Sequence, residues 1–465
     1  MELGRAWWLD EAAAALGGEP AEAPPLEGEA RADVAIAGGG YTGLWTALAL
    51  KEREPSLEVV LLEAETCGHG PSGRNGGFLH GFWGALPRVA ACFGRDAALE
   101  LCSAGEEIVP AVRAFCERRG ADVWLREGGM LTVATTARQE AAVEHEVALA
   151  RSLGAAEECV PLDRAALATR VRSPALRSAA FCRECATIQP ARLALALRQA
   201  ALDAGVRVHE RSPVTRVADG RLETARGAVA APEVVVATGA WGAAWRPLRR
   251  NLTPFGSTIV LTEPVPELLA EIGWTGGEAI LDARMFIHYL RTTPDGRVAI
   301  GSATGPIGFR GVVDARFDRD QASAETAAAG LRRLLPALAQ ARIERAWGGP
   351  IDVSSDYLPF FGTMPGKRVH YGAGYTGNGA GPSWLGGQVL ASLALRLDDR
   401  WAALPLVRRD VPGLPPEPFR RLGGGLVRAS VIAVERADEE GRRAPLTARL
   451  GAALPHLFGL RVGTR

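Results

Sequence analysis

The residues that point most directly to chemistry lie near the start of the chain. Residues 38–43 read Gly-Gly-Gly-Tyr-Thr-Gly and contain the spacing Gly-x-Gly-x-x-Gly directly after the apolar run 33–37. This spacing allows a tight turn, a close approach of backbone to a pyrophosphate, and packing of a helix on a sheet. Glu63 follows at the distance where a carboxylate binds a ribose diol and repels a 2′-phosphate. The predicted dinucleotide contacts are Gly38, Gly40, Tyr41, Thr42, Gly43 and Glu63, and NADP is disfavoured.

Two further glycine-rich passages distinguish flavin from nicotinamide. The apolar run 233–237 ends in Ala-Thr-Gly-Ala-Trp, which is similar to the second glycine motif of flavoproteins with two dinucleotide-binding domains. Residues 371–379 break into glycines before a helix expected from about Ser383, and such a helix N-terminus stabilises negative charge on a reduced flavin. We therefore expect FAD, with an NAD-dependent dehydrogenase as the alternative. The added cofactor contacts are Gly239, Trp241, Gly377, Asn378 and Gly379.

Three side chains are candidates for contact with a substrate. His80 closely follows a loop of residues 71–77, and an unperturbed imidazole titrates near neutral pH. Tyr289 and Arg291 lie two apart in an expected strand, so they share one face. A guanidinium on that face could hold a substrate carboxylate through two parallel hydrogen bonds. His80, Tyr289 and Arg291 are the expected catalytic residues, and a structural role for each is the alternative.

The composition disfavours several other classes of protein. The 465 residues carry 53 Lys+Arg and 53 Asp+Glu, whereas chains that bind nucleic acid normally have a basic excess. Lys51 and Lys367 are the only lysines, which argues against a Schiff-base mechanism. Cys182-x-x-Cys185 has no second pair nearby, so no metal site is expected. The start has no signal-peptide pattern and no stretch could span a bilayer, so a cytoplasmic protein without a transmembrane segment is expected.

The elements that must position these residues alternate between strands and helices. Residues 33–63 form one β-α-β unit, while residues 255–302 alternate polar and apolar and contain the hairpin turn Pro294-Asp295-Gly296. We expect an α/β fold with a Rossmann-like FAD domain of the two-dinucleotide-binding-domain type and an inserted α+β antiparallel-sheet substrate domain. The expected boundaries are an N-terminal tail at 1–30, a FAD domain at 31–90, 185–250 and 340–398, a substrate or cap domain at 91–184 and 251–339, and a C-terminal helical extension at 399–465.

Both ends of the chain carry unusual composition. Residues 11–30 combine Pro, Gly and acidic residues, which predicts a mobile approach to the first element. Trp7 and Trp8 are expected to dock on the body of the protein, because leaving such surface exposed is costly. Residues 415–450 are rich in arginine with apolar spacing, but acidic residues from Glu435 onward interrupt the basic face. A packed or solvated amphipathic helix is therefore favoured over a membrane-surface one.

Taken in order, the motifs resemble one family. They are the glycine loop 38–43, the loop Pro-Ser-Gly-Arg-Asn-Gly-Gly at 71–77, the hairpin Tyr289-x-Arg291-x-x-Pro-Asp-Gly, Trp-Gly-Gly at 347–349 with Asp356-x-x-Pro359, and the glycines of 374–379. This set is similar to the FAD-dependent D-amino-acid oxidase/glycine oxidase (DAO) superfamily over about residues 30–395. The loop at 72–77 most resembles that of the gamma-glutamylputrescine oxidase branch.

The resemblance implies a FAD domain built from separated segments and a substrate domain over the isoalloxazine ring. In the branch it resembles, the 72–77 loop runs along the FAD, which adds Ser72, Arg74, Asn75 and Gly76 to the cofactor contacts. The implied chemistry is dehydrogenation of a small amine or amino acid at its C–N bond, with hydride transfer to flavin N5. The resulting imine is hydrolysed to an aldehyde or a keto acid.

Two departures from relatives qualify what the resemblance implies. Sarcosine oxidases attach the flavin to a cysteine, and residues 341–395 contain none, so the FAD is expected to be non-covalent. The same relatives place a lysine over the flavin to activate oxygen, and neither lysine falls in the inserted domain, which leaves the electron acceptor open. The identity of the amine and the oligomeric state are also open. A FAD-bound module without turnover is the remaining alternative.

Overall fold

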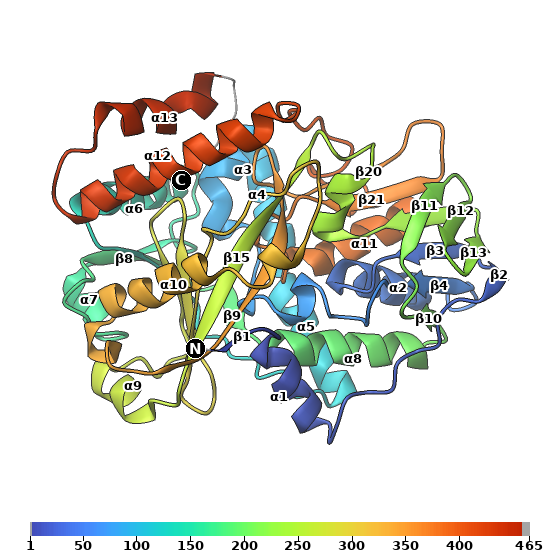
Figure 1. Ribbon diagram of the computed structural model, residues 1–465, viewed down its shortest axis with the longest axis horizontal. Helices are drawn as coiled ribbons and strands as arrows, with labels where there is room; N and C mark the ends of the chain where they lie inside the picture. The colour runs from blue at the N-terminus through green and yellow to red at the C-terminus, as the bar shows by residue number, and fades with distance from the viewer. Residues whose placement is uncertain (1, 458–465) are drawn as a thin grey trace.

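Figure 1 presents a computed structural model in which residues 2–457 are described. One of its sheets has six strands, and the residues of β3, β4 and β14 are all buried, as is typical of parallel strands covered on both faces. Five strands run parallel and β20 lies antiparallel at the edge. In sheet order they are β10 (Arg207–His209), β4 (Val59–Leu62), β3 (Val34–Ala37), β14 (Glu233–Val236), β21 (Val369–Ala373) and β20 (Phe360–Thr363).

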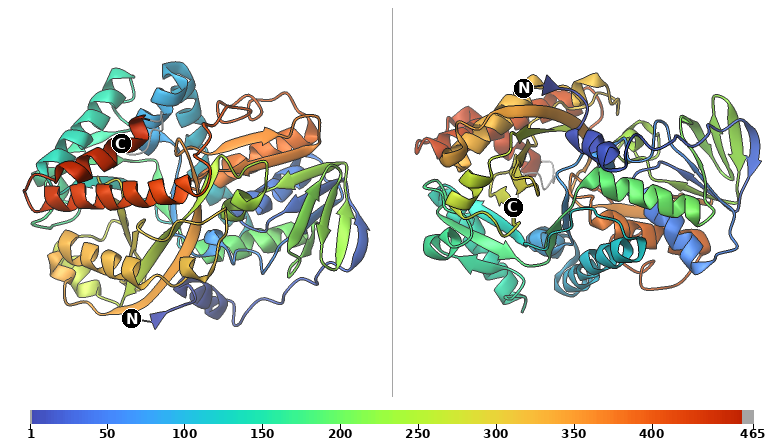
Figure 2. Two further views of the ribbon diagram at one scale, coloured as in Figure 1. Left: turned by 45° about the horizontal axis from the view of Figure 1, so that its top comes forward. Right: turned by 90° about the horizontal axis from the view of Figure 1, so that it is seen from below.

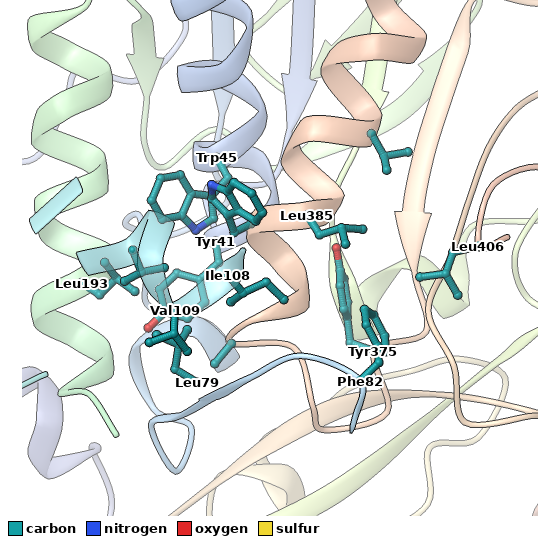
Figure 3. Packing of buried hydrophobic residues seen from close by; sticks show 14 of the residues in the cluster. Tyr41, Trp45, Leu79, Phe82, Ile108, Val109, Leu193, Tyr375, Leu385 and Leu406 are labelled. Carbon is teal, nitrogen blue, oxygen red and sulfur yellow. The ribbon is translucent and has the colours of Figure 1, made fainter. Parts of the chain in front are cut away.

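Alternate residues of β3 bury their side chains on opposite faces of this sheet. Val34 and Ile36 pack in the cluster that includes α2 (Tyr41–Arg53), α8 (Pro190–Asp203) and α11 (Pro382–Leu395). Figure 3 shows part of this cluster, with Trp45 and Leu385 pointing in from two of these helices. Ala35 packs on the other face, against a four-stranded sheet. That sheet consists of β11 (Val214–Ala218), β12 (Arg221–Thr224), β13 (Gly227–Ala230) and β2 (Gly28–Arg31).

A nine-stranded sheet forms the second large unit. Most neighbours are antiparallel, but β1 pairs with β19 and β16 pairs with β6 in parallel. In sheet order the strands are β1 (Glu2–Leu3), β19 (Ile343–Ser354), β15 (Leu252–Thr262), β18 (Val298–Ser302), β17 (His288–Thr292), β16 (Ala279–Asp282), β6 (Met130–Ala134), β8 (Ser178–Cys182) and β7 (Val160–Leu162). The strands β5 (Phe78–His80) and β9 (Cys185–Thr187) form a separate two-stranded sheet.

Helices cover one face of the nine-stranded sheet, and others pack beside the six-stranded one. The covered face of the nine-stranded sheet packs on α7, α9 and α10 around Leu290 and Ile300. The helices not yet given are α1 (Trp7–Ala15), α3 (Leu86–Phe93), α4 (Arg95–Glu106), α5 (Ile108–Arg119), α6 (Ala137–Ser152), α7 (Arg164–Ala168), α9 (Pro266–Ile272), α10 (Gln321–Leu334), α12 (Phe419–Glu439) and α13 (Leu446–Leu457). No helix within residues 2–457 combines the length and apolar character needed to cross a bilayer.

The domain boundaries differ from the expected ones at three places. Helices α4 and α5, expected in the cap segment 91–184, pack in the same cluster as α2 and α11 beside the six-stranded sheet. Strand β19 begins at Ile343 but belongs to the nine-stranded sheet, so this part of the expected FAD segment 340–398 lies in the other unit. Its alternation between the two faces suits a strand beside β15, which pairs with it along its whole length. The residue pattern of this strand does not show which sheet it joins. The glycine motif that follows it at 371–379 leads into the six-stranded unit, so the strand was expected there as well.

The N-terminal residues are also more tightly held than expected. Trp8 is fully buried and its ring lies edge-on to that of Trp347, so the docking predicted for this aromatic pair is confirmed. Residues 11–30 are not a free approach segment, because Ala23 N–H donates to Glu210 Oε2 at 2.6 Å and Leu26 N–H donates to Ser212 Oγ at 2.8 Å. The buried carboxylate of Glu210 also pairs with Arg198, so this contact is part of the interior.

Candidate active site

A cavity of about 1220 Å³ lies between the six-stranded and nine-stranded sheets. It takes in most of the residues that the sequence singled out, from elements far apart in the chain. Those lining it are Gly38, Gly40, Tyr41, Thr42, Glu63, Ser72, Arg74, Asn75, Gly76, His80, Gly239, Trp241, Tyr289, Gly377, Asn378 and Gly379. Gly43 and Arg291 are the two predicted site residues that do not line it.

The glycine loop connects β3 to the N-terminus of α2. Gly38 has φ +109°, and a Cβ there would lie 2.4 Å from the carbonyl oxygen of Ala237. A Cβ at Gly43 would lie 1.9 Å from the carbonyl oxygen of Gly38, so this glycine permits the close packing of helix on strand without facing the cavity. At Gly40 the neighbour is a side chain, Ser72 Oγ, which accepts a hydrogen bond from Tyr41 N–H at 2.9 Å. The helix N-terminus therefore faces the cavity with only small groups in front of it.

Glu63 stands where β4 ends and its carboxylate lines the cavity. Its Oε2 accepts from Gly39 N–H at 2.6 Å, and its Oε1 accepts from Glu65 N–H at 3.0 Å. Burial raises the pKa of this carboxyl, while the backbone donors oppose that rise. The position and the fixed orientation suit an acceptor for a ribose diol.

The 71–77 loop is braced by its own side chains and bound to the nine-stranded sheet. Asn75 braces it internally, since its Nδ2 donates to the carbonyls of Pro71 and Ser72 and its Oδ1 accepts from Gly77 N–H at 2.7 Å. Trp347 Nε1 on β19 donates to the carbonyl of Arg74 at 2.9 Å. The Arg74 side chain pairs with Asp318. The loop is thus held in one conformation along the wall of the cavity.

Tyr289 is the predicted substrate-site residue whose place is most closely defined. A Cβ at Gly76 would lie 2.9 Å from its ring, so only glycine lets the loop rest on this side chain. Its hydroxyl lies 2.8 Å from Ser257 Oγ on β15, and the Phe78 ring meets it edge-on. Burial raises the pKa of the phenol to about 12, so it is neutral at physiological pH.

Arg291 does not form the predicted carboxylate clamp. Although it shares a strand face with Tyr289, it is buried beneath Gly77 and donates to the carbonyl of Ile188 rather than reaching the cavity. Its guanidinium lies 5.4 Å from the ring centre of Trp8, and burial lowers its pKa to about 9. Helix α1, which carries Trp8, and the 71–77 loop fill the space that a substrate would have needed, and the local pattern around Arg291 does not indicate that packing.

His80 lines the cavity as predicted. Its Nδ1 lies 2.9 Å from the carbonyl oxygen of Gly81, so Nδ1 carries the hydrogen and Nε2 has a free lone pair in the neutral ring. Burial lowers the pKa of the imidazole, which favours that neutral form. The residue therefore has the properties of a proton acceptor.

The glycines at 374–379 lead into α11, which starts at Pro382 as the predicted helix start near Ser383 required. Asp352 on β19, which the sequence reading missed, holds this loop. Its Oδ2 accepts from Gly374 N–H at 2.6 Å, and its carbonyl accepts from Thr376 N–H at 3.1 Å. Burial raises the pKa of its carboxyl to about 6. A lone acid in a long alternating strand carries no local signal of such a role.

Several other residues that line the cavity could not be identified from the sequence, because these residues come together only when the chain folds. Phe255 and Phe286 stack with ring centres 6.0 Å apart, and the Arg88 guanidinium lies over the Tyr357 ring at 4.6 Å. Arg284, two residues after the end of β16, donates to Glu435 of α12. The alternation of β15 was the available signal, since it places Phe255 on the same face as Ser257.

The residues present fit FAD better than a nicotinamide dinucleotide. The helix N-terminus at Gly40 and the carboxylate of Glu63 offer a pyrophosphate and a ribose site at one end. The backbones of the 71–77 and 374–379 loops continue along the same cavity, where a second ring system would lie. A nicotinamide dinucleotide bound through the 38–43 loop alone would not require these two further loops along the cavity.

Comparisons with known proteins agree with this assignment. Residues 33–393 match the family model DAO, described as FAD dependent oxidoreductase. The chain is 31% identical over 383 residues to gamma-glutamylputrescine oxidoreductase of Escherichia coli, covering 80% of this chain and 86% of that protein. It is 28% identical over 393 residues to glycine oxidase of Geobacillus kaustophilus, covering 81% of this chain and 96% of that protein.

The fold has solved counterparts as well. The crystal structure of glycine oxidase from Geobacillus kaustophilus superposes with a TM-score of 0.67 at 25% identity, covering 82% of this chain and all of that one. L-proline dehydrogenase from P. horikoshii superposes with a TM-score of 0.65 at 19% identity. The resemblance read from the motifs is confirmed, and the chain belongs to the DAO family of FAD-dependent oxidoreductases.

Proposed function

We propose that this chain oxidises the C–N bond of an amine or amino acid to an imine, which water then hydrolyses to an aldehyde or keto acid. The observation that carries the proposal is the position of a neutral His80 and a neutral Tyr289 in one cavity with the predicted cofactor contacts. The amine class is supported by the activities named for the relatives, gamma-glutamylputrescine oxidoreductase and glycine oxidase.

Bound FAD supplies the acceptor for the hydride that leaves the carbon next to nitrogen. The chain's part is to deliver that substrate carbon with an uncharged nitrogen, because an ammonium has no lone pair to form the C=N bond. His80 Nε2 is the acceptor for the ammonium proton, since Nδ1 is already engaged by the Gly81 carbonyl. The phenol of Tyr289, held by Ser257, and the stacked rings of Phe255 and Phe286 exclude water from the reacting carbon.

Anaerobic mixing of the purified yellow protein with amines tests the proposal. The panel contains putrescine, gamma-glutamylputrescine, glycine, N-methylglycine and D-alanine, and we expect at least one of them to remove the blue absorbance of oxidised flavin. The amine that does so should yield an aldehyde or keto acid in equal amount. If no amine reduces a flavin that dithionite does reduce, the proposal is wrong and the chain is a FAD-bound module.

His80→Gln tests the role of the imidazole. The variant should retain its flavin, because none of the backbone hydrogen bonds at the glycine loop involve this residue. Loss of a general base typically slows the step by about 10²–10⁴-fold, and raising the pH should recover part of the loss by deprotonating the amine in solution. An unchanged rate at pH 7 would show that another group, or solvent, takes the proton.

A further inference from the structure

The C-terminal hairpin, formed by α12 and α13, lies outside the residues that match the family, which end at 393. Figures 1 and 2 show these two helices side by side, close to α6. The hairpin nevertheless supplies part of the cavity wall. Its lining residues are Val431, Val434, Glu435, Asp438, Arg449, Ala452 and Ala453.

Buried polar contacts fix the hairpin in this place. Arg284 Nη2 and Nε donate to Glu435 Oε2 at 3.0 and 3.1 Å, and Arg284 Nη1 lies 3.0 Å from Glu439 Oε1. The side chains of Arg284 and Glu435 are only 9% and 13% exposed. Thr136 Oγ1, just before α6, donates to Asp438 Oδ2 at 2.6 Å. The hairpin is therefore held in a defined position as one wall of the cavity.

This wall lies at the end of the cavity away from the dinucleotide contacts. Leu281 on β16 pairs directly with Tyr289 on β17, and Arg284 lies three residues beyond Leu281. Figure 1 shows α12 and α13 on the opposite side of the molecule from β3 and α2, between which the glycine loop lies. A substrate whose reacting carbon lies near Tyr289 would thus point its far end toward the hairpin.

The arginines that line the cavity differ in whether they are already engaged. Arg74 is paired with Asp318, Arg284 with Glu435, and Arg88 stacks over a tyrosine ring. Within residues 2–457, no carboxylate lies at ion-pair distance from either Arg138 on α6 or Arg449 on α13. The hydrogen bond between Thr136 and Asp438 brings the start of α6 against the hairpin, so both of these cations face the same end of the cavity.

We infer that Arg138 and Arg449 bind a carboxylate at the far end of the substrate, so that the preferred substrate is an amine with a remote negative charge. The inference rests on the proposed function and names its substrate class. Guanidinium groups hold carboxylates through paired hydrogen bonds. A substrate without the charge leaves both cations facing solvent and gains nothing from them.

The test compares two putrescine derivatives under anaerobic conditions. Gamma-glutamylputrescine carries an α-carboxylate, with its α-ammonium group, far from the primary amine of its putrescine end, whereas N-acetylputrescine has a similar amide and no charge there. We expect the half-saturating concentration for flavin reduction to be at least about tenfold lower for the glutamyl compound. Arg138→Gln and Arg449→Gln should each bring the ratio of the two concentrations toward one.

Two substitutions on the same elements serve as matched controls. Arg151→Gln on α6 and Arg443→Gln just before α13 remove the same charge from exposed positions that do not line the cavity, so they should keep the parent ratio. Equal half-saturation for both compounds in the parent overturns the inference, as does an equal effect of control and test variants. Flavin reduction by glycine or N-methylglycine but not by gamma-glutamylputrescine also overturns it, and leaves the proposed function standing. If no amine reduces the flavin, both proposals are wrong.

Discussion

Gly40 is the residue at which we expect the backbone to come closest to the pyrophosphate of FAD. A Cβ there would meet only the end of a side chain, Ser72 Oγ at 2.9 Å, so a larger residue can be accommodated by the fold but fills the cavity. We predict that Gly40→Asp yields a folded, colourless protein, because its carboxylate would repel the pyrophosphate. The visible spectrum gives the flavin-to-protein ratio of the variant, and circular dichroism checks that the variant is folded.

Gly40→Ala is the matched control for that substitution. It adds the Cβ without the charge, so it should keep part of its flavin. If Gly40→Asp purifies with a full complement of FAD, the pyrophosphate lies elsewhere and the assignment of the glycine loop is wrong.

Arg291 has a structural role in place of the clamp predicted for it. Its guanidinium satisfies the buried carbonyls of Ile188 and Thr292, and no carboxylate among the described residues pairs with it. Arg291→Met should lower the free energy of unfolding by about 1–3 kcal/mol, since these carbonyls lose a donor. The half-saturating substrate concentration should change by less than about twofold. Denaturant unfolding and anaerobic flavin reduction on one preparation give both values, and a tenfold rise in that concentration at unchanged stability would restore the clamp.

At the scale of elements, the first β-α-β unit could be predicted closely and the second sheet could not. Buried runs such as 33–37 and 58–63 are bounded by glycines and proline, so local pattern predicted β3, α2 and β4 within a few residues. Strand β19 has equally clear alternation, but its partner β15 lies about ninety residues earlier, and register over that distance is decided by tertiary packing.

The same distinction applies to the site. Glycine positions could be predicted because backbone geometry demands them, as at Gly38 with its positive φ. The partners of polar side chains could not, because Arg284 and Glu435 are 151 residues apart and neither belongs to a motif. For Arg291 the strand and the face it shares with Tyr289 were predicted correctly, but the predicted role as a carboxylate clamp was wrong.

Asp352 on strand β19 should make the free energy of unfolding depend on pH. An acid whose pKa is higher in the folded state than in the unfolded state favours folding when it is protonated. For Asp352 this advantage is complete below its ordinary value of 3.8 and is lost as the pH rises through about 6. We predict that Asp352→Asn gains stability relative to the parent between pH 4 and pH 7, by on the order of 2 kcal/mol.

Denaturant unfolding of the flavin-free protein at several pH values measures that difference. Asparagine can still accept the hydrogen bond from Gly374 N–H, so the loop should keep its anchor. Asp96→Asn on the exposed first turn of α4 is the control and should show no such trend. A constant difference between Asp352→Asn and the parent over this range would mean that the carboxyl is not buried as described.

At the scale of the whole molecule, three parts of the chain converge on one cavity. The six-stranded unit supplies the glycine loop, the nine-stranded unit supplies Tyr289, and the C-terminal hairpin supplies Glu435. Buried charged contacts join the hairpin to the rest on the cavity side, and Arg428 of α12 also donates to the carbonyl of Thr304. Leu422 and Leu450 are exposed. The attachment of the hairpin should therefore depend strongly on a few residues.

Glu435→Gln tests that dependence. The amide keeps the shape of the side chain but removes the charge that faces Arg284, and a hydrogen bond to a charged group contributes about 1.5–3 kcal/mol. We predict faster amide hydrogen exchange throughout α12 and α13, with unchanged flavin content because the dinucleotide contacts lie at the other end of the cavity. Glu440→Gln, at the exposed end of α12, is the control and should exchange like the parent. If Glu435→Gln protects the hairpin as well as the parent does, the charge of Glu435 is not what holds the helices, and the remaining contacts of Arg284 and Asp438 suffice.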